Sequence, residues 1–366
     1  MRPYVGKMRE VRKVAPPGLQ QVHMHEKIFS HHPHPVQSGI PTMHVEQQHG
    51  KVITHNYGHQ EGGWTLAPSF ATYVNGLLLD SPYSSGLGKE TPITVLGAGM
   101  LGLFTAYDLV QRGFENITIV AEKIEALPSH HAGALLTPVV TKNNVEMQKI
   151  VGQIGIDAYS FFESIAKGKN PDFKEGASLL SAYFESREQS GLESHVGTVM
   201  QPAKDVTLDF GNGTTRDMVA YDDAIYIDTV KMMAALHKHL KGKAMFEERK
   251  VTSFSDLRDS FIINCTGLGS AQFDGSHEAI PPQGHSVMLK NQKAEDMRYV
   301  IVSSHGDGKD KRSFYMYPKQ LPGAHAGDSG VIGGIVGEGA DKGKPHEQQL
   351  DSILHHAKDF FGTKLN

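Results

Sequence analysis

Three glycines, Gly97, Gly99 and Gly102, stand at a spacing that suits a bound nucleotide. Such a turn permits a tight bend, lets the backbone approach a pyrophosphate, and allows the following helix to pack closely on the preceding strand. The pyrophosphate then meets unpaired N–H groups and the positive end of the helix dipole. Glu122 lies where a carboxylate can accept hydrogen bonds from ribose hydroxyls and would disfavour a 2′-phosphate. These residues predict a dinucleotide site that does not suit NADP.

Strand, helix and strand must follow one another to position this turn. Ile93–Leu96 is a short β-like run, and apolar residues in 103–110 then recur on one face of a helix. Gly113 is placed to stop that helix, and Ile117–Val120 is a second strand that leads to Glu122. A glycine turn without a ligand is the alternative interpretation. The motif does not distinguish FAD from NAD, so an NAD-dependent dehydrogenase stays open at this point.

Composition narrows the class of protein. The 366 residues suggest one large or two medium domains, and 39% hydrophobic with 21% charged residues is typical of a soluble globular chain. The net charge of -4 gives no general reason to expect a nucleic acid partner. Cys265 is the single cysteine, which favours a reducing, cytoplasmic compartment. No run of about 18 apolar residues predicts a membrane span. We interpret Met1–Lys13 as a basic surface segment rather than an organellar transit peptide.

Several further elements follow from periodicity and turn chemistry. Residues 81–90 are polar, small and glycine-bearing, which predicts a flexible linker. Asp228 is placed to cap a helix, and Gly362 to stop the last one. The remaining expected elements are helices over 70–79 and 350–361, and strands over 261–263, 286–289, 300–302 and 331–336.

Beyond the glycine turn, the chain resembles the D-amino-acid oxidase family of FAD-dependent oxidoreductases along almost its whole length. The segment Val120–Lys123 followed by Ala132–Pro138 is similar to the family's early FAD-binding stretch. Arg249–Phe254 resembles the strand that contacts the adenine side, and Ile263–Gly269 resembles the second glycine turn. In the substrate-domain sheet the similar segments are Pro282–Val287, Ser313–Pro318 and Gly333–Gly334.

The most specific match is His55–His59 followed by Gly62–Thr65. In the family this segment lies near the carboxyl end and wraps the flavin, whereas here it precedes the dinucleotide motif. The resemblance therefore implies a circular permutation, in which residues 81–90 join the old carboxyl end to the old amino end. Such a rearrangement is tolerated where the termini of a domain lie close together at its surface.

The resemblance implies FAD as the cofactor. A flavin gains negative charge at its pyrimidine edge on reduction, and a glycine-rich turn can aim backbone N–H groups there. The segments His55–Thr65 and Asn264–Gly269 also argue against an NAD enzyme, which does not need them. The expected cofactor-binding residues are Gly97, Gly99, Met100, Leu101, Gly102, Ala121, Glu122, Lys123, Ala134, Leu135, Val251, Thr266, Gly267, Gly62, Gly63, Trp64 and Thr65.

The resemblance also implies a reaction, in which FAD takes a hydride from a carbon that bears an amine, and oxygen or a quinone accepts the electrons. An arginine and tyrosines usually grip the substrate carboxylate in the family. Tyr315 falls on one tyrosine position, but Lys311 stands at the second and His44 at the arginine. The family's upstream arginine-proline pattern is replaced by His32–Pro35. A protonated histidine could hold a carboxylate, with Lys311 or Arg312 as other sources of charge. We expect Tyr315 and His44 to be the catalytic residues.

The expected fold is α/β, with a Rossmann-like FAD-binding domain and a smaller antiparallel-sheet substrate domain in circularly permuted order. The expected function is oxidation of the C–N bond of a small amine or amino acid. The alternative is a non-catalytic flavin-binding protein that kept the fold but lost the substrate arginine. No metal is expected, because the histidines at 23–34 lack the spacing of a structural zinc site. The expected domains are 40–150, 226–275 and 330–366 for FAD, and 151–225 and 276–329 for substrate.

Overall fold

The chain forms two compact units, each assembled from stretches that are separated in the sequence. The first unit comprises Met1–Phe29, Leu179–Ala224 and Gly284–Asn366, and the second comprises Ser30–Ser178 and Ile225–Gln283. The computed structural model describes residues 9–31, 41–59, 62–132, 134–136, 145–274, 283–305, 312–320, 324–325, 327–335 and 346–363.

The second unit is built on a sheet with the strand order β11-β6-β5-β12-β4-β3. Every neighbouring pair is parallel except β3 with β4, which is antiparallel. All four residues of β5 and of β12 are buried, as expected for central strands that are covered on both faces. The strands are β3 (Val45–Gln48), β4 (Lys51–His55), β5 (Ile93–Leu96), β6 (Ile117–Ala121), β11 (Met245–Glu248) and β12 (Phe261–Asn264).

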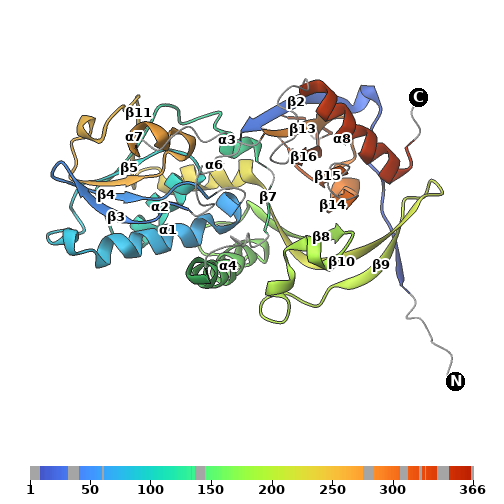
Figure 1. Cartoon of the computed structure of the whole chain (residues 1–366), viewed down its shortest axis with the longest axis horizontal. Helices are drawn as coiled ribbons and strands as arrows, with labels where there is room; N and C mark the ends of the chain where they lie inside the picture. The colour runs from blue at the N-terminus through green and yellow to red at the C-terminus, as the bar shows by residue number, and fades with distance from the viewer. Residues whose placement is uncertain are drawn as a thin grey trace. The chain divides into compact units, whose positions relative to one another are not determined.

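Helices cover this parallel sheet, and α1 packs along α2 and α4 (Figure 1). A separate apolar cluster joins Ile53, Leu96, Val120 and Ile262 to Phe254. The side chain of Asp228 caps α6 by accepting from the Lys231 N–H, as predicted. The short strand β7 (Ala134–Leu135) pairs with Tyr226 and Ile227. The helices are α1 (Gly63–Asp80), α2 (Met100–Gln111), α3 (Pro128–His131), α4 (Val145–Ala166), α6 (Thr229–Leu240) and α7 (Ala271–Asp274).

The first unit is built on a sheet with the strand order β1-β9-β10-β8-β14-β15-β16-β13-β2. The pairs β1–β9 and β8–β14 are parallel, whereas β9–β10, β14–β15, β15–β16 and β13–β16 are antiparallel. Its elements are β1 (Glu10–Lys13), β2 (Met24–His31), β8 (Ala177–Phe184), α5 (Arg187–Ser190), β9 (Lys204–Asp209), β10 (Thr215–Ile227), β13 (Gln283–Leu289), β14 (Tyr299–His305), β15 (Arg312–Tyr317), β16 (Val331–Ile335) and α8 (His346–Phe361).

This α/β arrangement of a parallel sheet and a second sheet confirms the expected fold class. Two ranges, however, fall in other units than the sequence analysis placed them. Residues 330–366 lie in the first unit, where Leu350 and Phe361 of α8 share a core with Phe314 and Ile332. Residues 151–178, expected in the substrate domain, lie in the second unit. An amphipathic pattern predicts that a helix has an apolar face, but it does not say which sheet that face covers.

Residues 81–90, which are predicted to be a linker, contain hydrogen-bonded turns. The Oγ of Ser81 accepts from the Tyr83 N–H, and a 3-10 turn follows over Pro82–Ser84. Lys89 lies over the Phe114 ring, with 4.3 Å between its Nζ and the ring centroid. Small and polar residues suit such tight turns.

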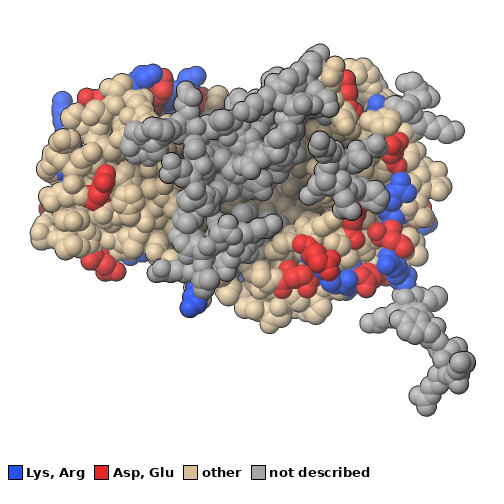
Figure 2. Space-filling view, viewed as in Figure 1, with Lys and Arg blue, Asp and Glu red and all other residues tan. Residues whose placement is uncertain are grey.

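Charged side chains of opposite sign are interspersed on the face drawn in Figure 2. In the first unit, Arg12 contacts both Glu10 and Asp222, and Lys204 also contacts Asp222. Pairs of this kind on a surface contribute little to stability individually. Within the described residues, no helix is both long and apolar enough to cross a membrane.

Candidate dinucleotide site

The first glycine turn links β5 to α2, and two of its glycines are required by close packing within the protein. Gly97 has a φ of +115°, and a Cβ at this position would lie 2.5 Å from the carbonyl oxygen of Cys265. A Cβ at Gly102 would collide with the carbonyl oxygen of Gly97. Gly99 differs, because its φ is -71° and the nearest atom to an added Cβ is the Oγ of Ser129 at 3.2 Å. The fold therefore tolerates a Cβ at Gly99 better than at the other two positions.

The amino end of α2 offers backbone N–H groups without a local cap. Gly99 stands at the N-cap and supplies no side chain, and the Met100 N–H donates to the Oγ of Ser129 at 3.2 Å. Leu101 and Gly102 follow in the first turn of the helix. Such an end carries a partial positive charge and is a suitable site for phosphate oxygens. Sequence reasoning missed Ser129, although it lies between the two matched segments 120–123 and 132–138.

The segment before residue 66 lies against the glycine turn. The indole Nε1 of Trp64 donates to the carbonyl oxygen of Ser129 at 2.9 Å. A Cβ on Gly63 would lie 2.5 Å from the Cε of Met100. The structure thus places side by side two segments that are separated in the sequence, Gly62–Thr65 and the glycine turn at 97–102. Ser129 contacts both of them, once through its hydroxyl and once through its carbonyl.

The helix α1 presents a second amino end without a side-chain cap. It is 18 residues long, and Gly62 stands at its N-cap. The hydroxyl of Thr65 donates back to the carbonyl oxygen of Gly62 at 3.2 Å. The N–H groups of the first turn of a helix have no partner within the helix and point out of its amino end. The amino ends of α1 and α2 therefore both contact Ser129, α1 through the Trp64 indole and α2 through the Met100 N–H.

The second glycine turn follows β12 and touches the first one. The Oδ1 of Asn264 accepts from the backbone N–H of Thr266 at 3.2 Å and from its hydroxyl at 2.7 Å. Gly267 continues the turn with a φ of +56°. The carbonyl of Cys265 is the group that approaches Gly97 so closely. Burial raises the pKa of the Cys265 thiol to about 12, so this side chain is neutral and has a structural role.

The expected ribose and adenine residues lie at the ends of β6, β7 and β11. Glu122 follows β6, is exposed, and lies with its carboxylate 3.6 Å from the Nζ of Lys250. Lys123 is also exposed. The carbonyl of Ala121 accepts from the Arg249 N–H at 2.8 Å, which aligns the segment that leads to the buried Val251. Ala134 and Leu135 form the buried strand β7 of the same unit.

A buried histidine close to Gly63 has no hydrogen-bond partner among the described residues. Both ring nitrogens of His59 lack a partner, and burial lowers the pKa of the imidazole to about 3. Its ring packs on Phe70 at 4.1 Å between centroids. A buried polar group without a partner is costly, and a polar ligand would remove that cost. Together with the two helix amino ends at Ser129 and the absence of a side chain at Gly99, this residue makes the site suitable for FAD.

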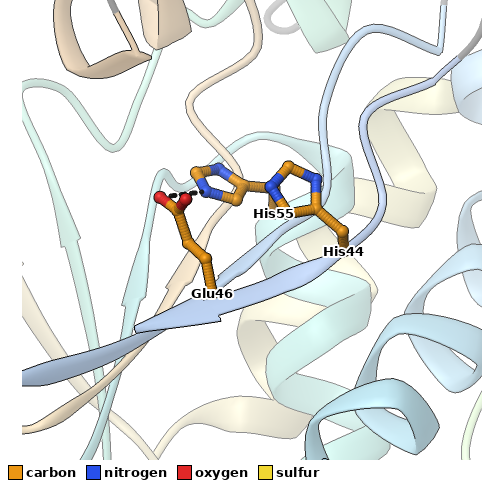
Figure 3. A group of neighbouring side chains, drawn as sticks. All are labelled: His44, Glu46 and His55. Atoms are coloured by element: carbon orange, nitrogen blue, oxygen red, sulfur yellow. Dashed lines mark hydrogen bonds and ion pairs between the residues drawn. The ribbon is translucent and has the colours of Figure 1, made fainter. Parts of the chain in front are cut away.

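Three side chains form a compact group on the hairpin of β3 and β4 (Figure 3). His44, Glu46 and His55 each offer one ligand atom, and these atoms lie within 4.8 Å of one another. In the described part of the chain this is the one group with the spacing of metal ligands. His55 is buried, and its Nε2 lies 3.2 Å from the Oε1 of Glu46. The sequence analysis named His44 as a substrate residue, whereas it named His55 only as the start of the segment that resembles the flavin loop and did not single out Glu46.

The expected substrate residues are described in different units. Tyr315 lies on β15 in the first unit, with its ring stacked on Tyr317 at 4.7 Å. The absence of a side chain at Gly333 makes room for it, because a Cβ there would lie 2.5 Å from the Tyr315 hydroxyl. His44 lies in the second unit. Lys311 and His32–Pro35 fall outside the described residues, as does the side chain of Arg312.

The expected histidine cluster at 23–34 is described only in part. His23 belongs to a 3-10 turn rather than a strand, and its Nδ1 lies 3.3 Å from the carbonyl oxygen of Lys290. His25 lies on β2. No metal-ligand group among the described residues includes either of them.

Comparisons with known proteins point to one family. The model of the DAO family, described as FAD dependent oxidoreductase, matches residues 92–365. The chain is 23% identical over 288 residues to a D-amino-acid oxidase of Fusarium vanettenii, with 72% of this chain and 75% of that protein covered. Its structure is similar to a glycine oxidase from Bacillus cereus ATCC 14579, with a TM-score of 0.53, 15% identity and coverage of 74% and 79%. An L-proline dehydrogenase from P. horikoshii gives a TM-score of 0.51 at 16% identity, with 75% and 77% covered.

Proposed function

This chain belongs to the DAO family of FAD-dependent oxidoreductases, and from that premise we propose that it oxidises the C–N bond of a small amine or amino acid. The observation that carries the proposal is that the amino ends of α1 and α2 both contact Ser129, beside a glycine turn in which Gly99 presents no side chain. The D-amino-acid oxidase relative supports an amino acid as the substrate class.

In this proposal the second unit holds FAD along the carboxyl ends of its parallel strands. Met100, Leu101 and Gly102 bind the pyrophosphate through the amino end of α2. Glu122 accepts from the ribose hydroxyls, and the backbone near Val251 flanks the adenine. Gly62–Thr65 direct N–H groups toward the flavin ring, while Thr266 and Gly267 lie beneath it. When bound, FAD supplies the acceptor for a hydride, and oxygen or a quinone reoxidises it.

On the substrate side, Tyr315 is the stronger of the two expected residues. Its hydroxyl can donate to a substrate carboxylate, and Gly333 leaves room for the Tyr315 side chain. His44 is the weaker one, because the carboxylate of Glu46 lies in the same compact group and would repel a substrate carboxylate. A role for His44 in substrate binding therefore requires that His44 is protonated.

A non-catalytic flavin-binding protein is the second candidate function. The observation in its favour is that two of the three positions that grip the carboxylate in the family do not carry their usual residue, since His44 stands at the arginine and Lys311 at a tyrosine. Such a protein binds FAD but does not transfer electrons to it from any amine. The two candidates thus differ in flavin reduction rather than in flavin binding.

We also propose that the chain is a circular permutant of the family. The family match begins at residue 92, whereas β4 and α1 precede it. Nevertheless β4 pairs with β12 in register, from Phe261↔Val52 to Asn264↔His55, and α1 packs on α2. These earlier elements complete the same sheet, as the family's carboxyl-terminal part would. A reordered gene that encodes 91–366 before 1–80 is expected to yield a folded protein that binds FAD, and an insoluble product would contradict this.

The experiment for the reaction is anaerobic reduction of the FAD-loaded protein by a panel of D-amino acids, glycine and N-methyl amino acids. Loss of the oxidised flavin absorbance with at least one compound supports the enzyme. Stable flavin absorbance with every member of the panel favours the non-catalytic protein. Failure to retain any FAD contradicts both candidates.

A further inference from the structure

A chain of hydrogen bonds leads from Glu46 through the buried His55 to the second glycine turn. The Nε2 of His55 lies 3.2 Å from the Oε1 of Glu46, and its Nδ1 lies 3.2 Å from the Nδ2 of Asn264. Asn264 in turn holds Thr266 through two hydrogen bonds. Both His55 and Asn264 are buried, at 2% and 0% exposure, so water does not readily replace these contacts.

The direction of each hydrogen bond follows from the donors that are fixed. The backbone N–H of Thr266 can only donate, so the atom of Asn264 that faces it must be the oxygen. The Nδ2 of Asn264 is then a donor, and the Nδ1 of His55 must accept from it. A neutral imidazole has one donor and one acceptor, which places the proton on Nε2, directed at Glu46. The arrangement is satisfied only while His55 is neutral.

A second proton on His55 reverses the inner hydrogen bond. With both ring nitrogens protonated, Nδ1 becomes a donor that faces the donor Nδ2 of Asn264. Asn264 must then turn or withdraw, and its oxygen is what fixes Thr266. The adjacent carbonyl of Cys265 lies so close to Gly97 that a Cβ there would be 2.5 Å away. A shift of this backbone therefore disturbs both glycine turns at once.

Some of the groups around His55 favour a second proton on its imidazole, and others oppose it. The carboxylate of Glu46, 42% exposed, attracts a second proton onto the ring. The His44 ring, 4.6 Å away between centroids, repels it whenever His44 is itself charged. Tyr57 and Phe254 pack edge-on against the ring at 5.6 and 6.2 Å and carry no charge at neutral pH. The Nδ2 donor of Asn264 opposes the second proton directly.

We propose that His55 is a proton-sensitive positioning residue, which holds the second glycine turn in its FAD-binding conformation only while the imidazole is neutral. This inference rests on the proposed function, because FAD is the ligand whose affinity reports on the turn. Since the binding conformation requires the neutral ring, FAD affinity is full at higher pH and falls as His55 takes up its second proton.

The same donor assignment argues against a metal ion in this group. A metal bound at the Nε2 of His55 would have to replace the proton there and move it to Nδ1, against the Asn264 donor. Titration with Zn²⁺ alone at neutral pH is therefore expected to give no stoichiometric binding that depends on Glu46. Stoichiometric Zn²⁺ binding that Glu46→Gln abolishes would overturn the proton assignment.

The test is the dissociation constant of FAD between about pH 8 and about pH 5.5, the range in which histidines charge. We expect the natural chain to bind FAD about tenfold more weakly at the lower pH, the usual effect of one buried hydrogen bond turned unfavourable. His55→Asn keeps an acceptor near the Nδ1 position but cannot titrate, so its affinity should not change with pH. His55→Phe lacks the acceptor and should bind weakly throughout.

The matched control is His49→Asn, because His49 is an exposed residue on the same hairpin with a φ of +50° that asparagine tolerates. This variant should follow the natural chain at every pH. Glu46→Gln should move the loss of affinity to lower pH, since it removes the attraction for the second proton. The ¹⁵N shifts of the His55 ring, read without FAD, should show the proton on Nε2.

Two results would overturn the inference, and they are distinguishable. If His55→Asn shows the same pH dependence as the natural chain, His55 is not the sensing group. If the natural chain binds no FAD at any pH, the proposed function fails and this inference fails with it. Thermal unfolding of each variant, measured alongside, separates loss of the turn from loss of the fold.

Discussion

Replacing Gly99 by alanine separates a nucleotide-binding turn from a glycine turn that serves the fold alone. The added Cβ meets only the Oγ of Ser129, at 3.2 Å, and the φ of -71° suits alanine. Alanine in place of glycine at an N-cap lowers the free energy of unfolding by about 1 kcal/mol or less. The methyl group would stand where the pyrophosphate must approach the N–H groups of α2. Losing one charge-assisted hydrogen bond costs about 1.5–3 kcal/mol, which is roughly 10- to 100-fold in affinity.

The assay is FAD binding by equilibrium titration, with thermal unfolding of the FAD-free protein measured on the same samples. Gly99→Ala should lower the affinity by that factor and leave the unfolding temperature nearly unchanged. The matched control is Gly76→Ala in α1, where nothing lies within 4 Å of the added Cβ. It should stabilise the helix by about 0.5–1 kcal/mol and leave FAD binding unchanged. Affinity of Gly99→Ala equal to that of the natural chain would refute the reasoning.

Four further predictions follow from the described contacts. Burial lowers the pKa of His59 to about 3, so below pH 6.5 the unfolded chain binds more protons than the folded chain does. The free energy of unfolding therefore decreases as the pH is lowered from 6.5. Urea unfolding at pH 6.5 and about pH 5 measures this decrease in the free energy of unfolding. The decrease should be about 2 kcal/mol larger in the natural chain than in His59→Phe. Cys265 should resist thiol reagents until the protein unfolds, and rapid labelling of native protein would contradict its burial. Glu122→Gln should weaken FAD binding about tenfold, and an unchanged dissociation constant would exclude its contact with the ribose. If an amine substrate is found, Tyr315→Phe should lower kcat/KM about tenfold without affecting FAD affinity.

The elements around the first glycine turn could be predicted closely from the sequence, because their signals are local. The strand expected over Ile93–Leu96 has those bounds in the structure, and the strand expected from Ile117 extends by one residue to Ala121. The apolar face at 103–110 belongs to α2, which begins earlier at Met100. Periodicity and turn chemistry determine such elements without help from distant parts of the chain.

The contacts that assemble the site could not be predicted in this way. Asn264 meets His55 across 209 positions of the chain, and Ser129 meets Trp64 across 65. No pattern within a short window reports such a pair. His44 was named from the resemblance alone, and its closeness to Glu46, which weakens the substrate role, became visible only in the hairpin. The unit to which α8 belongs likewise depends on which sheet its apolar face covers.

The central claim is that one FAD lies between the segment before residue 66 and the turn at 97–102. Trp64 is the single tryptophan of the chain, and its indole contacts Ser129, which also accepts from the Met100 N–H at the start of α2. Titration of the FAD-free protein while Trp64 fluorescence is followed therefore tests whether the bound FAD lies near this residue. We predict quenching that saturates at one FAD per chain. Saturable FAD binding that leaves the Trp64 emission unchanged would contradict the proposed position, and no saturable binding would contradict the FAD assignment itself.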